Sequence, residues 1–299
     1  TILALGVEAG EDQAANEGDP ISVVATFTDG REGVTHTATI EWGDGAQANG
    51  VVSETAFTIT GTHAYADNDV YTVTVSVDDG LGHRASDTLQ VMVENVAPTA
   101  VLVNDGPKDE ASAVTVSFTD VHDPGTEDMH TYSFDWESDG MYDVVTTTAS
   151  AAYTWADNGV YTVTGQVEDK DGGTSVYTTV VTVDNVAPII ALEGADTVDE
   201  GAIYTLTLGT ITDPGDDIVA TWTVEWGDDA TDNYTQNGDV THVYADGPAN
   251  PIITVDLTDE DATHPLAGSK SITVTNVAPT IALEGADTVD EGAIYTLTL

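Results

Sequence analysis

The sequence predicts an all-β protein built from tandem antiparallel β-sandwiches, each with about seven strands. A tetrapeptide, Asn-Val-Ala-Pro, recurs at 95–98, 185–188 and 276–279, and its prolines are 90 and 91 residues apart. Apolar and polar residues alternate along many short segments, as expected of half-buried strands. Clusters of Asp, Asn and Gly separate these segments, and no helical period is present.

The recurring tetrapeptide indicates copies of one folded unit joined end to end. It divides the 299 residues into three complete repeats, 1–98, 99–188 and 189–279, followed by the start of a fourth, 280–299. Proline has no backbone donor and keeps the preceding residue extended. We call 95–98 the first joint and 185–188 the second joint, and expect such short, stiff joints to arrange the repeats as a rod.

The last residues repeat an earlier part of the chain almost unchanged. Residues 276–299 match 185–208 at every position except one, where Thr280 stands in place of Ile189. This near-identity indicates recent duplication and predicts a long array. Because Thr1 matches Thr99 and Thr280 in position, and the chain stops within a repeat at Leu299, we expect a segment of a longer protein.

Each repeat contains the same order of expected strands. The clearest is 71–77, in which Tyr71, Val73, Val75 and Val77 face one side and polar residues face the other. Other strands of the first repeat are expected at 2–7, 21–27, 36–42, 51–52, 56–59 and 89–93. The strongest counterparts are 114–118, 132–136, 161–167 and 177–183 in the second repeat, and 204–208, 222–226, 253–257 and 272–274 in the third.

Four short motifs follow one another in the first repeat. They are Trp42-Gly43-Asp44-Gly45, His63-Ala64-Tyr65, Tyr71-Thr72-Val73-Thr74-Val75 and Asp78-Asp79-Gly80. Together they resemble the polycystic kidney disease (PKD) repeat. The later repeats carry variants: an insertion at 136–140, and Gly227-Asp228-Asp229, which lacks the second glycine.

The resemblance implies an immunoglobulin-like sandwich that occurs in tandem on secreted and cell-surface proteins. It implies a role in adhesion or spacing and no catalysis. Residues 94–98 and 184–188 also look like the linkers of cadherins, in which calcium lies between domains.

The charge of the chain limits its partners. Fifty-three acidic and five basic residues give a net charge of −48, which would repel nucleic acid and anionic membranes. Cations are the natural partners, and the excess of Asp over Glu favours calcium, which prefers hard oxygen ligands. A halophilic or merely soluble surface is the alternative. Without cysteine, bound metal is one candidate for added stability, and no apolar run is long enough to span a membrane.

Acidic loops are expected to meet at the joints. Loops alternate between the two ends of a sandwich, so stacked repeats bring the exit end of one against the entry end of the next. The expected calcium ligands are Asp29, Asp78, Asp79, Asn95, Glu110, Asp120, Asp123, Asp169, Asp171, Asn185, Glu200, Asp213, Asp216, Asp259 and Asp261. Exit-end acids such as Glu17, Asp67 and Asp157 are weaker candidates. The alternative is ordinary turn chemistry, because Asp and Asn are frequent in turns.

Other constellations are less informative. Asp135, Glu137, Asp139, Gly140 and Asp143 have the spacing that begins an EF-hand loop, but Thr146 replaces the closing Glu, so an acidic hairpin turn is favoured. The histidines at 63 and 242 are expected to be structural. The tryptophans at 42, 136 and 226 are expected in the cores, while those at 155 and 222 either pack in the core or stack on sugars.

The sequence therefore predicts an extracellular, calcium-stabilised repeat array that forms a stalk, adhesin or fibre of a microbial cell surface. A self-assembling filament or surface layer, and a polysaccharide-binding accessory array of a secreted hydrolase, are the alternatives. The expected partners are calcium ions and neighbouring repeats, with other copies of the chain and surface glycans left open. Catalysis, nucleic-acid binding and membrane insertion are not expected of this segment.

Overall fold

The computed structural model describes residues 4–298, and all regular secondary structure in them is β-strand. The predicted all-β class is confirmed. Within those residues, no helix has the length and apolar character needed to cross a membrane. The first residues of the strand expected at 2–7, and Thr1 and Leu299, lie outside the described part of the chain.

The chain forms two compact units. Unit 1 contains the chain up to Lys108 together with Ala113–Tyr153 and Val160–Thr182. Unit 2 contains Asp109–Ser112, Thr154–Gly159 and the chain from Val183 onward. The first joint therefore lies inside unit 1. The second joint lies inside unit 2, with two loops of the second repeat.

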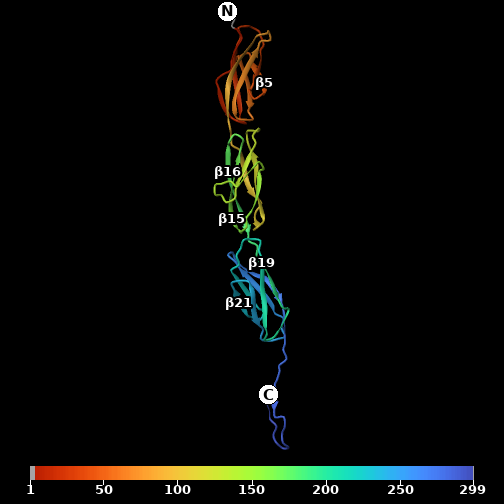
Figure 1. Cartoon of the computed structure of the whole chain (residues 1–299). Helices are drawn as coiled ribbons and strands as arrows, with labels where there is room; N and C mark the ends of the chain where they lie inside the picture. The colour runs from red at the N-terminus through yellow and green to blue at the C-terminus, as the bar shows by residue number, and fades with distance from the viewer. Residues whose placement is uncertain (1–3, 299) are drawn as a thin grey trace. The chain divides into compact units, whose positions relative to one another are not determined.

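The first repeat is a two-layer sandwich with sheet order β1-β3-β6-β5-β4-β7-β8-β2 (Figure 1). Its strands are β1 (Gly6–Glu8), β2 (Gln13–Asn16), β3 (Pro20–Thr28), β4 (Thr37–Glu41), β5 (Gln47–Ser53), β6 (Thr58–Ala64), β7 (Asp69–Asp78) and β8 (Arg84–Glu94). Strand β5 connects the layers, since 47–50 pair with β4 and 51–53 pair with β6.

The second and third repeats follow the same plan. The second has sheets β14-β11-β9 and β10-β16-β15-β12-β13; the third has β17-β19-β22, β21-β20-β23-β24 and the pair β18-β25. The strands of the second are β9 (Thr99–Asn104), β10 (Lys108–Asp109), β11 (Ala113–His122), β12 (Thr131–Asp135), β13 (Val144–Thr146), β14 (Ser150–Thr154), β15 (Gly159–Glu168) and β16 (Thr174–Asp184). Those of the third are β17 (Ile189–Gly194), β18 (Thr197–Asp199), β19 (Ile203–Thr212), β20 (Thr221–Glu225), β21 (Thr231–Tyr234), β22 (Gly238–Val243), β23 (Ile252–Thr258), β24 (Thr263–Ser271) and β25 (Thr273–Thr275).

Each repeat contains a short edge strand that the alternation pattern did not predict. The segment Gln13–Asn16 was expected to be part of a loop, but it forms β2, which pairs in parallel with β8. Strand β18 pairs in parallel with β25 in the same way. Segments of two to four residues are too short for a period to be recognised. These edge strands matter because each is followed directly by a glutamate at one end of the sandwich.

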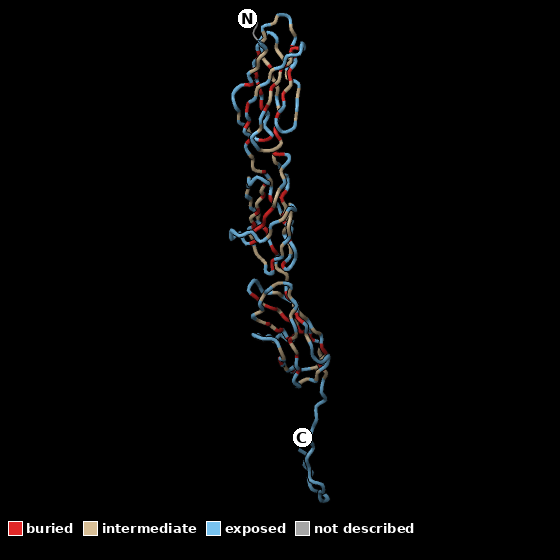
Figure 2. Tube along the Cα trace, turned by 45° about the horizontal axis from the view of Figure 1, so that its top comes forward, coloured by how far each residue is buried: buried red, intermediate tan, exposed pale blue. Residues whose placement is uncertain are grey.

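The buried residues lie along the inner faces of the strands (Figure 2). In β7, Val73, Val75 and Val77 are at most 1% exposed, as the alternation predicts. The three expected core tryptophans, Trp42, Trp136 and Trp226, are 1%, 2% and 0% exposed. Each follows a strand that pairs with the long central strand of its repeat: β4 with β7, β12 with β15, and β20 with β23.

The residues after the last Asn-Val-Ala-Pro motif, 276–279, form a hairpin of two short strands, β26 (Glu284–Gly285) and β27 (Leu297–Thr298). Glu284 pairs with Thr298, as Glu193 pairs with Thr207 in the matching hairpin of the third repeat. All residues described from 280 onward are exposed. The local pairing of a sandwich is thus present here without a core beneath it, and its edges are unpaired.

Truncation of Trp42 tests the core assignment. Trp42→Ala should destabilise the first repeat by about 3–5 kcal/mol, because a large cavity replaces a fully buried side chain. We expect backbone amides of β7 to exchange with deuterium much faster in this variant, with β23 of the third repeat as an internal control. The exposed substitution Val51→Ala should leave exchange unchanged, since Val51 is 69% exposed. Unchanged protection of β7 in Trp42→Ala would contradict the assignment.

Candidate metal centres at the two joints

A buried glutamate follows the short edge strand of the first and second repeats. Glu17 and Glu110 are each 1% exposed. The Glu17 amide donates to the Glu94 carbonyl at 3.1 Å, and the Glu110 amide donates to the Asp184 carbonyl at 2.9 Å. These bonds hold each glutamate beside the last strand of its own repeat, immediately before the joint.

One carboxylate oxygen of each glutamate binds the joint. The Val96 amide donates to Glu17 Oε1 at 2.7 Å, and the Val186 amide donates to Glu110 Oε1 at 2.7 Å. The other oxygen, Oε2, is buried and has no hydrogen-bond partner among the described residues in either case. A buried carboxylate oxygen without a partner is costly, so this atom points to a missing ligand.

Two aspartates lie close to each glutamate, and at the first joint one of them, Asp123, also lies 2.9 Å from His130 Nε2. They come from the Asp-Pro-Gly loop that follows β11 or β19 in the next repeat. We call these groups the glutamate clusters; their ligand oxygens lie within 4.8 Å of one another, and they are Glu17, Asp123 and Asp128 at the first joint, and Glu110, Asp213 and Asp217 at the second. In the described part of the chain, buried oxygens of Asp128, Asp213 and Asp217 also lack hydrogen-bond partners.

The glycine of each Asp-Pro-Gly loop makes this approach possible. A Cβ atom at position 125 would lie 2.6 Å from Glu17 Oε2 and 2.6 Å from Asp128 Oδ2. A Cβ atom at position 215 would lie 2.6 Å from Glu110 Oε2. Any side chain at these positions would therefore collide with the carboxylates, so the loop needs glycine in order to sit against the glutamate.

A second group of three carboxylates adjoins each glutamate cluster and shares one aspartate with it. We call these groups the aspartate clusters; they are Asp67, Asp128 and Asp171 at the first joint, and Asp157, Asp217 and Asp261 at the second. Their ligand oxygens also lie within 4.8 Å of one another. Asp128 and Asp217 therefore stand between two sites.

The crowding of carboxylates disfavours their ionised forms. Burial raises the pKa of Asp217 to about 6, and the nearby charges of Glu110 and Asp213 add to the shift. Burial also raises the pKa of Glu17, although the Val96 amide opposes the change. The pKa of Asp128 is raised by burial too, against the influence of Lys170. A cation between these groups would favour the charged forms.

Backbone and amide contacts complete each joint. The Glu127 amide donates to the Ala66 carbonyl at 3.3 Å, and the Asp216 amide donates to the Ala156 carbonyl at 2.9 Å. The asparagine side chain of each joint donates a hydrogen bond to an acidic loop of the next repeat. Asn95 Nδ2 donates to Asp169 Oδ2 at 3.0 Å, and Asn185 Nδ2 donates to Asp261 Oδ2 at 3.0 Å.

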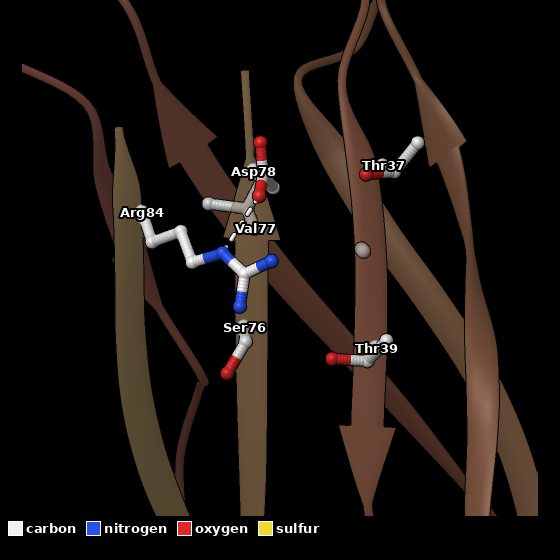
Figure 3. Close-up of a pocket in the computed structure, with 7 residues that line it drawn as sticks. Thr37, Thr39, Ser76, Val77, Asp78 and Arg84 are labelled. Atoms are coloured by element: carbon white, nitrogen blue, oxygen red, sulfur yellow. Dashed lines mark hydrogen bonds and ion pairs between the residues drawn. The ribbon is translucent and has the colours of Figure 1, made fainter. Parts of the chain in front are cut away.

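The three predicted aspartate ligands of the first repeat have basic partners. Asp78 accepts a hydrogen bond from Arg84 Nε at 2.7 Å (Figure 3). Asp79 lies 2.7 Å from both Arg31 Nη1 and His83 Nδ1. Asp29 lies 3.3 Å from His36 Nε2 and 3.5 Å from Arg31 Nη1. These three aspartates form internal ion pairs, and no metal group among the described residues includes them.

The other predicted residues divide between the joints and ordinary turns. Asp123, Asp171, Glu110, Asp213 and Asp261 belong to the clusters. Asp120 and Asp216 are exposed. Asp169 and Asp259 accept amide hydrogen bonds within their own loops, and both oxygens of Glu200 accept bonds, from the amides of Gly247 and Val277.

Five members of the clusters lie outside the main set of expected ligands: Glu17, Asp67, Asp128, Asp157 and Asp217. The sequence placed Glu17, Asp67 and Asp157 among the weaker exit-end candidates and Asp217 in the acidic loop that also holds Asp213 and Asp216, so Asp128 alone was not named. The repeat register supports Glu17, because it stands where Glu110 and Glu200 stand in their repeats. Asp128 lies five residues after Asp123, whereas Asp217 lies four residues after Asp213. An alignment of the repeats therefore does not place the two aspartates at the same position. Only the folded loops bring their carboxylates to the same place.

The EF-hand-like segment is a hairpin whose carboxylates bind its own backbone. Asp135 accepts hydrogen bonds from the amides of Asp139 and Gly140 at 3.2 and 2.8 Å. Asp143 accepts one from the Trp136 amide at 3.0 Å. Asp135, Glu137 and Asp143 could hold an ion, but the acids already serve the turn, as the preferred interpretation of the sequence requires.

The aromatic and histidine residues have structural roles. His63 stacks on Trp42 and lies 2.6 Å from Asp44 Oδ2. The counterpart His242 stacks on Trp226 and lies 2.7 Å from Asp228 Oδ2. The structural role expected of both histidines is observed. The two tryptophans that depart from the repeat pattern, at 155 and 222, are 5% and 7% exposed, so they pack in the cores and do not form a sugar-stacking surface.

Comparison with protein families identifies the first repeat. The PKD domain family model matches residues 6–93. The first repeat is a PKD domain. The resemblance inferred from its four motifs is thus confirmed there, over less than a third of the chain. The second and third repeats share the order of strands and the buried tryptophan of this PKD domain. A comparison with curated proteins found no match.

Several solved structures are similar at low identity. Fibronectin(III)-like modules of Clostridium thermocellum CbhA share 16% identity, with 60% of this chain and 94% of that chain covered and a TM-score of 0.26. Domains of titin share 13%, covering 92% and 99%, with a TM-score of 0.36. SGBP-B of Bacteroides ovatus, in complex with a mixed-linkage heptasaccharide, shares 13%, covering 95% and 72%, with a TM-score of 0.23. Similarities at this level carry no argument about ligands.

The pH dependence of the first repeat tests the ion pairs of Asp79. Burial opposes ionisation of this carboxyl, but the amides of His83 and Leu81 and the His83 ring outweigh it and lower the pKa to about 2. A lowered pKa stabilises the folded state above the unfolded value near 3.9, and this stabilisation is lost as the pH falls toward 2. Asp79→Asn should therefore lower the melting temperature at pH 7, and the difference from wild type should shrink between pH 4 and 2. Calorimetry measures this, with exposed Glu32→Gln as control; a pH-independent difference would contradict the assignment.

Proposed function

We propose that the chain is part of an extracellular repeat array whose joints bind calcium, and that it serves as a stalk or spacer at a cell surface. The buried glutamate at each joint carries the proposal. One of its oxygens accepts a hydrogen bond from the joint amide, and the other has no partner among the described residues although two aspartates lie nearby. The PKD domain at 6–93 supports an extracellular location and a role without catalysis.

Calcium suits the glutamate clusters better than other common ions. The donors are carboxylate oxygens, and calcium accepts six to eight such ligands in a flexible geometry. Magnesium demands a smaller octahedral site and keeps its waters. Three carboxylates from two successive repeats converge on one point, so a single ion would tie both repeats to the joint. Such a tie is the physical basis for a stiff array.

Calcium dependence of stability is the first test of this proposal. A ligand that binds only the folded state stabilises it by about 2.7 kcal/mol at a hundredfold excess over the dissociation constant. Melting temperature should therefore fall when calcium is replaced by a chelator, and magnesium should restore it poorly. If sodium chloride alone restores the chelated protein, the acidity is a halophilic adaptation and the proposal fails.

Substitution of the two glutamates separates metal binding from the joint hydrogen bond. In the double variant Glu17→Gln, Glu110→Gln, each side chain keeps an oxygen for the Val96 or Val186 amide but loses its charge. We expect the calcium-dependent rise in melting temperature to become much smaller, with the chelated protein as stable as wild type or more so. Exposed Glu193→Gln in β17 is the control. A double variant with an undiminished calcium response would show that calcium binds elsewhere.

A further inference from the structure

The two joints carry opposite charges at one position, which lies between two aspartates in the loop that precedes the last long strand of a repeat. The loop sequence is Asp169-Lys170-Asp171 in the second repeat and Asp259-Glu260-Asp261 in the third. Lys170 and Glu260 are therefore equivalent in the fold but opposite in charge. Both loops supply an aspartate to an aspartate cluster.

At the first joint, the lysine neutralises the aspartate cluster. Lys170 Nζ donates to Asp67 Oδ1 at 2.6 Å and to Asp171 Oδ2 at 2.7 Å, and it also donates to Asp128 Oδ1. All three members of the cluster thus share one ammonium group. The remaining oxygen of Asp128, Oδ2, faces the neighbouring glutamate cluster and has no partner.

At the second joint, the matching aspartate has no such partner. Both oxygens of Asp217 are buried without a hydrogen bond in the described structure. Glu260 accepts a hydrogen bond from the Ile218 amide at 2.8 Å and adds a further negative charge. Apart from Lys170, the basic side chains are paired elsewhere, Arg31 with Asp79, Arg84 with Asp78, Lys108 with Asp105, and Lys270 with Asp196.

We propose that the second joint binds two calcium ions that share Asp217, whereas the first joint binds one ion and uses the Lys170 ammonium in place of the other. The first ion at each joint lies in the glutamate cluster. The second ion, found only at the second joint, is held by Asp157, Asp217 and Asp261. This inference rests on the proposed calcium function and assigns a different number of ions to joints that have the same fold.

Two overlapping groups of carboxylates support two ions. Glu110, which is 1% exposed, has an unpartnered buried oxygen among the described residues and belongs to the glutamate cluster. Asp157 and Asp261 belong to the aspartate cluster, which shares only Asp217 with the glutamate cluster. One carboxylate can bridge two cations because each of its oxygens is available. The two oxygens of Asp128 also differ in their contacts. Oδ1 accepts a hydrogen bond from Lys170, and Oδ2 has no partner among the described residues.

Calcium titration of the full chain tests the inference through paired substitutions at the equivalent positions. Isothermal titration calorimetry with calcium alone, in buffer with physiological sodium chloride, should count one more ion in Lys170→Gln than in wild type. Lys170→Arg, which keeps the positive charge, should gain none. Glu260→Lys should bind one ion fewer than wild type, and Glu260→Gln, which removes charge without supplying an ammonium, should bind the same number.

The outcomes distinguish this inference from the proposed function. If wild type binds calcium but the ion count is unchanged in both Lys170→Gln and Glu260→Lys, the lysine is not a substitute for an ion and the inference is overturned. If wild type binds no calcium, the proposed function itself fails. Asp157→Asn gives an independent check, because this exposed ligand belongs only to the second ion, so its loss should remove one ion and leave the others.

Discussion

Repulsion between buried carboxylates is the constraint on which the arrangement at each joint depends. A glutamate that is 1% exposed holds the joint amide with one oxygen, so it cannot turn away to solvent without breaking that bond. The aspartates opposite it come from a loop whose glycine lets the backbone approach the glutamate closely. The fold therefore holds the carboxylates together, and either a positive charge or protonation relieves their repulsion.

The sandwiches provide the rigid support for these loops. The edge strands β2 and β10 end at the glutamates, and β11 and β19 end at the Asp-Pro-Gly loops, so strands with buried inner faces determine where each carboxylate lies. The buried tryptophans and the central strands hold each sandwich together, so its core does not depend on the residues in the loops. The acidic loops are thus free to vary in charge while their positions stay constant.

Variation of one loop residue illustrates this separation. Lys170 and Glu260 occupy the same place after β15 and β23, and neither contributes to a core. Exchange of the two charges would change the electrostatics of a joint without altering its fold. In the first repeat, Asp79 of the equivalent loop forms ion pairs with Arg31 and His83. These two basic side chains balance the negative charge there, as Lys170 does at the first joint. On this scaffold, basic side chains serve as counterions in the first repeat and at the first joint, and the proposed calcium ions would serve where no basic side chain does.

The sequence by itself determined the longer strands, the repeat and the cores, because alternation, turn residues and a 90-residue period are signals that the fold preserves. Val73 and Val75 were placed correctly by a period of two, and Trp42 by its position in the repeat. The tertiary structure alone decided which acids meet. Asp128 and Asp217 follow their loops at different intervals, and Asp29, Asp78 and Asp79 were expected at a metal site but found basic partners. Such contacts join residues far apart in the chain, and loop conformation, which has no period, controls them.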